Sequence, residues 1–182
     1  MAEEVKQKEK VVSKAGTQTD RRPQQRRHRR RVSRRGERVR SEFDQKVIGI
    51  RRVTRVVAGG RRFSFSVAVV IGNRKGSVGV GVGKASDTAL AIEKATRDAK
   101  KNMLIVKLSD DARLPYEVSA KYAASRVSII PAPGKGLVAG SSVRTVLELA
   151  GVKDVTAKIF SRSKNRINNA RAAIEALKQF SE

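Results

Sequence analysis

The hydrophobic residues between Phe63 and Lys84 alternate with polar or small residues on both sides of a polar turn. Before the turn the sequence reads FSFSVAVVI, and after it Val78, Val80 and Val82 alternate with glycines. A period of two places alternate side chains on opposite faces of a strand. The stretch therefore predicts a β-hairpin with these valines on the core side. Because glycine weakens a strand, a glycine face indicates that another backbone comes close there.

The flanking patterns extend this hairpin into a β-β-β-α unit over residues 45–102. Residues 45–57 predict a first strand, with a bulge or loop at Gly49 where the alternation breaks. After the hairpin, Ser86 is the expected cap of a helix, with Asp87 in its first turn. Three strands with one covering helix can bury a core. The expected buried stripe of the helix, at three- and four-residue spacing, is Ala89, Ile92, Ala95, Ala99 and Met103.

The second half of the chain predicts a β-β-β-α-β-α order, an α/β sandwich. Its strands are expected at residues 104–108, 117–123, 126–130 and 155–160. One helix is predicted from a Ser141 or Ser142 cap to Ala150, with Gly151 at its end. Asn165 is expected to cap the last helix. The whole chain is thus predicted to be α+β, divided into a basic arm (1–44), a first domain (45–108) and a second domain (109–182).

Charge narrows the function classes more than the hydrophobic pattern does. The 182 residues include 41 Lys and Arg against 17 Asp and Glu, a formal net charge of +24. Such an excess favours a polyanionic partner, with nucleic acid first and an anionic membrane surface second. No apolar run reaches the ~18 residues that a membrane-spanning helix requires, so no membrane span is expected.

Composition also excludes several kinds of catalytic and metal site. The chain has no cysteine, and its one histidine, His28, lies within an arginine run. Thiol chemistry, cysteine-ligated zinc and imidazole catalysis are therefore excluded or nearly so. Aromatic residues make up 4% of the chain, too few for base stacking to be the main mode of recognition. We expect no metal, no cofactor and no small-molecule substrate.

The N-terminal 44 residues lack apolar periodicity and are predicted to be disordered. Residues 21–40 carry eleven arginines and one glutamate. A solvated tail or a nuclear-import-like run is one interpretation of such a charge block. An arm that becomes ordered on RNA phosphates is the favoured one. A transit peptide is disfavoured by the acidic residues Glu3, Glu4, Glu9 and Asp20.

Two glycine-lysine segments raise the possibility of nucleotide binding. Around Gly83 and Lys84 the P-loop spacing fails, because Val78 stands at the first glycine position and Ala85 follows the lysine. The segment from Pro133 to Ser142 loosely resembles the phosphate loop of galactokinase-type kinases. It has two extra residues, however, and no carboxylate nearby to act as a base or hold magnesium. We therefore expect no enzyme activity.

The basic residues fit phosphate contact better. Five arginines, at positions 51, 52, 55, 61 and 62, are predicted to cluster at one end of the first two strands. Others fall in or beside predicted loops, where cations can reach phosphate oxygens without disturbing the fold. A merely solvated basic face is the alternative interpretation.

Several motifs, taken in order, resemble the bacterial ribosomal protein S-five family of the small ribosomal subunit. They span roughly residues 45–180 and include GGRRFSFS from Gly59, GSVGVG from Gly76, KKNM from Lys100, VLELAGV from Val146 and NRIN from Asn165. The resemblance implies a first domain similar to a double-stranded-RNA-binding domain. It also implies a second domain with a left-handed β-α-β crossover.

The resemblance further implies a structural ribosomal protein that supports subunit assembly and decoding accuracy in the cytoplasm. Its implied partners are small-subunit (16S-type) ribosomal RNA, the ribosomal proteins S-four and S-eight, and messenger RNA in the entry channel. A free-standing RNA-binding or RNA chaperone module is the alternative. The predicted RNA-contacting residues are Arg51, Arg52, Thr54, Arg55, Gly59, Gly60, Arg61, Arg62, Arg74, Lys75, Lys84, Lys135, Arg162, Lys164 and Arg166.

This chain departs from the family pattern at some of these positions. Arg166 stands where a proline is common, at the first turn of the last helix, and Asn73 replaces an aspartate in the hairpin turn. The loop at Pro133 is about one residue shorter than usual, at the segment where the family meets S-four. The arginine-rich N-terminus is not a general family feature.

Overall fold

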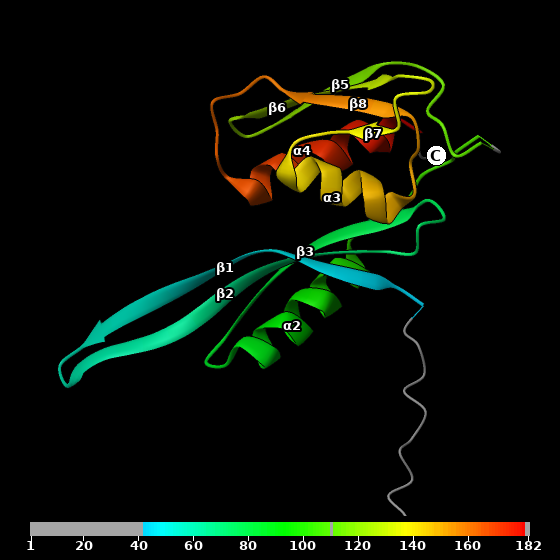
Figure 1. Cartoon of the computed structure of the whole chain (residues 1–182). Helices are drawn as coiled ribbons and strands as arrows, with labels where there is room; N and C mark the ends of the chain where they lie inside the picture. Colours follow the sequence, from blue (N-terminus) through cyan, green and yellow to red (C-terminus); the bar gives the residue numbers. More distant parts are fainter. Residues whose placement is uncertain (1–41, 110, 181–182) are drawn as a thin grey trace, which may run out of the picture. The chain divides into compact units, whose positions relative to one another are not determined.

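The alternating segments of the first half form a four-stranded antiparallel sheet in the order β1-β2-β3-β4. The computed structural model describes residues 42–109 and 111–180. These residues belong to one compact unit, Val39–Glu182. Helix α2 (Thr88–Lys101) connects β3 to β4 and lies against one face of the sheet (Figure 1). The strands are β1 (Asp44–Val57), β2 (Gly60–Gly72), β3 (Ser77–Ala85) and β4 (Met103–Ile105).

Of the bulge or loop predicted at Gly49, the structure shows a bulge. The pairing of β1 with β2 shifts its register between Val47 and Gly49. The extra residue, Ile48, is buried among the hydrophobic residues that face the second half. A bulge increases the local twist of the strand that contains it. The disordered arm predicted for residues 1–44 lies outside the described residues, apart from its last three.

The close approach of another backbone to the glycine face of β3 is confirmed, and that backbone belongs to α2. A Cβ atom added at Gly81 would overlap with the backbone of Ala95 and Ala99, and Gly79 and Gly83 are equally close to the helix. The sheet and helix can therefore pack more closely than side chains on both surfaces would permit.

The inner part of β2, residues 67–72, is consequently buried on both of its faces. Val67, Val69 and Ile71 pack with the alanines of α2. The alternate residues, Ala68 and Val70, join the larger hydrophobic cluster that includes α3 and α4. The valines of β3 point the same way as Ala68 and Val70, so the predicted core side is the side that faces the second half.

The second half contains a mixed sheet in the order β5-β6-β8-β7, in which only β7 and β8 run parallel. Helices α3 and α4 lie between this sheet and the first one (Figure 1). The α+β class is confirmed, and β7-α3-β8 is a parallel β-α-β unit, whose left hand stays a prediction. The elements are β5 (Val118–Tyr122), β6 (Ser125–Pro131), β7 (Leu137–Val138), α3 (Ser141–Ala150), β8 (Val155–Ile159), α4 (Arg166–Leu177) and η1 (Lys178–Phe180).

Backbone hydrogen bonds join the two halves at the end of α3. The amide of Arg74, in the β2–β3 turn, donates to Leu149 O at 2.9 Å, and the amide of Gly76 donates to Ala150 O at 2.8 Å. Carbonyls in the last turn of a helix have no partner within the helix. The β2–β3 turn of the first half thus supplies hydrogen-bond donors to the free carbonyls at the end of α3 in the second half. Gly151 ends α3 with a left-handed φ of 84°.

Some local predictions about helix α2 are wrong. Asp87, not Ser86, is its N-cap, and Ala89 is exposed. Met103 lies in β4 rather than in the helix. The buried residues are Ala91, Ala95 and Ala99, which are four apart and lie opposite the three glycines. Because only the alanines opposite the glycines are buried, the buried stripe of α2 is narrower than the hydrophobic spacing predicts.

Two short strands differ from the prediction because they depend on pairing with distant segments. The strand predicted at residues 104–108 as part of the second half is only Met103–Ile105, and it pairs with β3 in the first sheet. Strand β7 has no counterpart among the predicted strands. Ser141 begins α3 instead of capping it, since the N-cap is Gly140, which has no side-chain cap bond. The cap at Asn165 is confirmed by its side chain, which accepts a hydrogen bond from the Ile167 amide at 3.2 Å.

We predict that Gly81→Ala destabilises the protein by about 1–3 kcal/mol, because the new methyl group would force β3 and α2 apart. Gly49→Ala is the matched control, since a methyl group there would have no other atom within 4 Å. Urea unfolding followed by circular dichroism measures both variants. Equal free energies of unfolding for the two would show that the glycine face does not set the packing distance.

Candidate nucleic-acid interface

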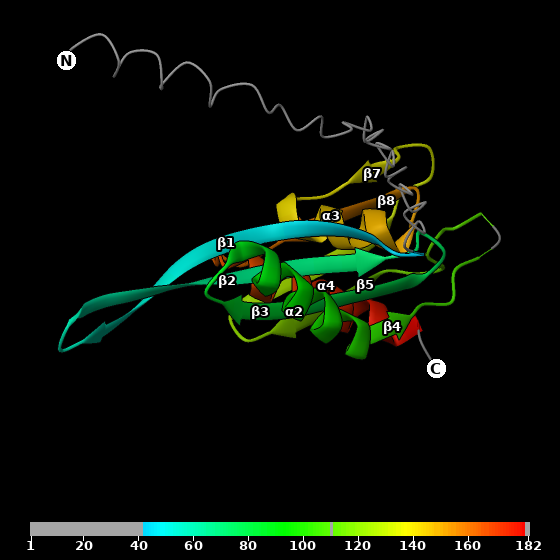
Figure 2. The ribbon, with the colours of Figure 1, turned by 90° about the horizontal axis from the view of Figure 1, so that it is seen from below.

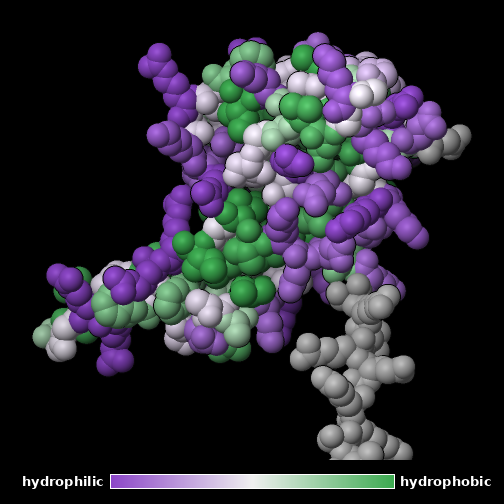
Figure 3. Space-filling view, viewed as in Figure 1, coloured by the Kyte–Doolittle hydropathy of each residue, from purple (hydrophilic) through white to green (hydrophobic). Residues whose placement is uncertain are grey.

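The β1–β2 hairpin extends beyond the rest of the first sheet. Strand β3 pairs with β2 only as far as Ala85, which is opposite Phe65. Residues 53–64 therefore form a two-stranded projection, here called the hairpin arm, which Figure 2 shows reaching past β3 and α2. In Figure 3 hydrophilic side chains stand out along the arm, with hydrophobic ones between them.

The structure places eight of the predicted contact residues on the hairpin arm or at its base, and all eight are exposed. Arg55 of β1 is the direct cross-strand partner of Arg62 of β2. Like charges that face each other across two strands are destabilising. Residues 50–66 contain no Asp or Glu that could offset them. The eight are Arg51, Arg52, Thr54, Arg55, Gly59, Gly60, Arg61 and Arg62.

The side of the arm nearer α2 carries an aromatic ring that is not among the predicted contact residues. The guanidinium of Arg52 lies 4.7 Å from the centre of the Phe63 ring, which is 47% exposed. Thr54 is opposite Phe63 on the same face. A planar cation over an exposed ring offers a stacking surface to a base as well as charge to a phosphate. In the sequence, the signal for this ring is the FSF motif beside two arginines.

A basic cavity, here called the notch, lies at the base of the arm. It has a volume of about 240 Å³ and is lined by parts of β1, β2 and the start of α4. Its cations are Arg51, Lys164 and Arg166, which are far apart in the sequence. Arg166 Nη1 donates a hydrogen bond to Ile48 O at 3.1 Å, which links α4 to the bulge of β1.

Two further predicted residues are neighbours of residues that line the notch, Lys84 by strand pairing and Arg162 in the sequence. Lys84 of β3 is opposite Ser66 of β2, which is in turn opposite Arg51. The three residues thus form a row across three strands. Arg162 is exposed in the loop between β8 and α4, two residues before Lys164.

The remaining predicted residues lie elsewhere. Arg74 and Lys75 belong to the turn at the far end of β2, about 40 Å from the tip of the arm at the usual rise per residue. Arg74 forms an ion pair with Asp44 at 3.0 Å. Lys135 is in the loop between β6 and β7, near the start of β8, whereas Lys164 follows the end of β8. Arg74, Lys75 and Lys135 are therefore not part of the basic group at the arm and the notch.

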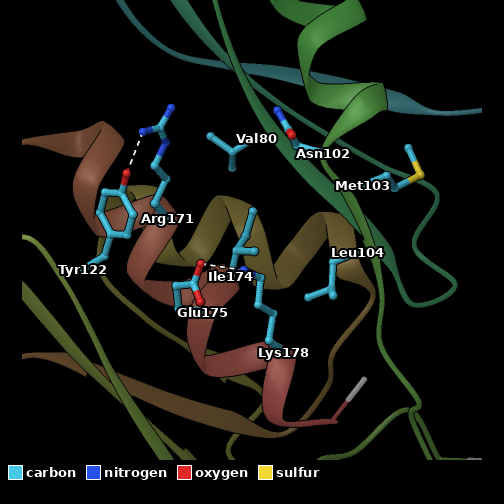
Figure 4. A pocket seen from close by; sticks show the side chains of 9 residues that line it. All are labelled: Val80, Asn102, Met103, Leu104, Tyr122, Arg171, Ile174, Glu175 and Lys178. Atoms are coloured by element: carbon cyan, nitrogen blue, oxygen red, sulfur yellow. Dashed lines mark hydrogen bonds and ion pairs between the residues drawn. The ribbon is translucent and has the colours of Figure 1, made fainter. Parts of the chain in front are cut away.

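A second cavity, of about 400 Å³, lies between β3, β4 and α4 (Figure 4). Its charged side chains already have partners within the protein. Arg171 donates to Tyr122 Oη at 2.8 Å, and Lys178 pairs with Glu175 at 2.7 Å. Since these cations are satisfied and a carboxylate is among them, this cavity is less suited to an anion than the notch is.

Within residues 42–109 and 111–180 no group of acidic or histidine side chains could hold a metal ion. None of the helices in these ranges combines the length and the hydrophobicity of a membrane-spanning segment. The segment compared with a kinase phosphate loop forms a loop and the two-residue strand β7 before α3.

Two family descriptions together match most of the chain. Residues 43–107 match "Ribosomal protein S5, N-terminal domain", and residues 120–182 match "Ribosomal protein S5, C-terminal domain".

Individual relatives agree with these matches. The chain is 52% identical over 138 residues to the "Small ribosomal subunit protein uS5" of Synechococcus elongatus, covering 75% of this chain and 76% of that protein. It is 50% identical over 138 residues to "Small ribosomal subunit protein uS5c" of Rhodomonas salina, with 75% and 82% coverage. For uS5 of Mesomycoplasma hyopneumoniae the identity is 46% over 156 residues, with 85% and 72% coverage.

We predict that Arg166→Ala lowers the free energy of unfolding by about 1 kcal/mol, because the Ile48 carbonyl loses its side-chain donor. Lys164→Ala, a change two residues earlier in the loop before α4, should stay within about 0.5 kcal/mol, as for an ordinary surface position. Thermal unfolding of the two variants measures the difference. If Arg166→Ala is as stable as Lys164→Ala, the bond to Ile48 contributes nothing to the link between the halves.

Proposed function

Because the chain belongs to the ribosomal protein S5 family, we propose that it binds small-subunit ribosomal RNA directly through the hairpin arm and the cations at its base. It is a structural constituent of the small ribosomal subunit and not an enzyme. Its contribution to the ribosome is then geometric and electrostatic.

The observation that carries the proposal is the unbalanced charge of the hairpin arm and its base. Five arginines fall within residues 50–66 without a carboxylate, and Arg55 faces Arg62 directly. In the free protein this arrangement is unfavourable, whereas phosphate groups beside the arm would convert the repulsion into attraction. Contacts of this kind fix position and orientation without reading base sequence.

The rest of the fold supports such a role by anchoring the arm through β2. The arm continues β1 and β2, and the inner part of β2 is buried between α2 and the second half. RNA phosphates bound at the arm would therefore be held at a fixed position relative to the whole protein. The two predicted domains, residues 45–108 and 109–182, would act together in fixing the geometry of converging RNA segments.

We also propose that the second half contacts protein neighbours, which the family resemblance gives as S-four and S-eight, with messenger RNA nearby. Three large hydrophobic side chains support a protein contact in this half: Ile130, Val138 and Phe160 are 39%, 51% and 64% exposed. Ile130 and Val138 both have Thr156 as a neighbour on β8, so they share one face of the sheet. Exposed apolar groups that lie together mark interaction surfaces.

Sedimentation tests the proposed function against a free-standing RNA-binding module. We expect the full chain to comigrate with small subunits on a sucrose gradient and to remain there after a wash of about 0.5 M salt, where surface attraction is strongly screened. The same gradient run with a peripheral basic protein serves as the control. If the chain stays at the top of the gradient, the module that acts in trans is the better description.

The double variant Arg55→Gln/Arg62→Gln should bind small-subunit ribosomal RNA more weakly without unfolding. The slope of log affinity against log salt should fall by about 0.7–0.9 for each phosphate that the variant no longer neutralises. Arg97→Gln on α2 is the control, because Arg97 is already paired with Glu93 at 3.5 Å. Filter binding at several salt concentrations gives the slopes. Identical slopes for the double variant and the wild type would remove the arm from the interface.

A further inference from the structure

The notch at the base of the arm differs from the rest of the basic surface because three cations line one cavity. Arg51 comes from β1, while Lys164 and Arg166 come from the β8–α4 connection. None of the residues that line it is acidic, and Ser66 adds a hydroxyl group. Its volume of about 240 Å³ is below the roughly 300–1,000 Å³ of typical small-molecule sites, which suits a single small group.

The cations of the notch are available for a ligand. Among the described residues, the side chains of Arg51 and Lys164 have no ion pair or hydrogen bond. Arg166 uses one N–H to hold the Ile48 carbonyl, and a guanidinium has five such donors. This bond fixes the side chain in place while other donors remain, which lowers the entropy lost when an anion binds.

The start of α4 adds to the positive potential. Arg166 and Ile167 line the notch and are the first two residues of this twelve-residue helix. Partial positive charge accumulates at a helix N-terminus and favours anions there. The three side chains, rather than the helix end, define the site, but the two effects have the same sign.

We propose that the notch binds one phosphate group of the small-subunit ribosomal RNA backbone, with Arg51 and Lys164 contacting it together. This inference rests on the proposed function. The bound phosphate would touch both halves of the protein, since Arg51 belongs to the first and Lys164 and Arg166 to the second. RNA binding would thus reinforce the junction that the bond from Arg166 to Ile48 already makes.

A double-mutant cycle in the full chain tests whether one phosphate is shared. Arg51→Gln and Lys164→Gln should each lower affinity for small-subunit ribosomal RNA about tenfold, as expected for loss of one charge-assisted bond. Combined, they should weaken binding clearly less than the product of about 100-fold, because residues that share a partner are coupled. The control cycle pairs Arg51→Gln with Arg162→Gln, which is in the same loop but does not line the notch.

The outcomes separate this inference from the proposed function. If the wild type does not prefer small-subunit ribosomal RNA over an unrelated RNA, the proposed function fails. If it does, and the Arg51 and Lys164 effects multiply as in the control cycle, only the notch proposal is overturned. Unchanged thermal unfolding of both single variants ensures that folding is not the cause of either result.

A titration with sodium phosphate, compared with sodium chloride at equal ionic strength, tests whether the notch binds free phosphate instead of an RNA phosphate. We expect the backbone amide signals of Gly49, Ile50 and Ile167 to shift with phosphate in the wild type and not in Lys164→Gln. Phosphate-dependent shifts together with a multiplicative RNA cycle would assign the notch to a free anion and overturn its role in RNA binding.

Discussion

The architecture depends on the short distance between β3 and α2. Three glycines on one face of β3 let the helix backbone reach the sheet, so small alanines are sufficient to fill the interface. With one face of the first sheet covered in this way, its other face is free to pack against α3 and α4. The central strands of the first sheet therefore belong to the hydrophobic cores of both halves, and the halves are not independent bodies joined by a linker.

The placement of the basic residues follows from that sharing. Strand β2 is longer than β3, so its outer part has β1 as its sheet neighbour and projects as the arm. Its buried inner part packs against the helices of the second half, and this packing places the loop before α4 beside the base of the arm. Residues separated by more than 100 positions in the chain, such as Ile48 and Arg166, meet because one strand serves two hydrophobic clusters.

Much of this arrangement could be predicted from the sequence, and the limits have physical causes. Period-two alternation and the glycine face identified the central hairpin, and the positions of five arginines predicted a basic cluster at one end of the first two strands. The projection of that end as the hairpin arm was not predicted, because it depends on where β3 stops pairing with β2. The joining of Arg51 with Lys164 and Arg166 could not be predicted, because it depends on tertiary packing rather than on local spacing. The same holds for β7, a two-residue strand that exists through its pairing with β8, and for the alanine stripe of α2, which the glycines select.

Strand β1 is also an edge of the first sheet, with one row of backbone hydrogen-bonding groups not paired to another strand of that sheet. A fourteen-residue edge is long enough to recruit a strand from another molecule and start aggregation. Bulges and charged residues are two devices that prevent such pairing, and β1 has both, at Val47–Gly49 and in its lysine and arginines. Mutual repulsion of these edges would keep newly made copies apart until a polyanion neutralises them, so the charge that suits assembly also protects the protein before assembly.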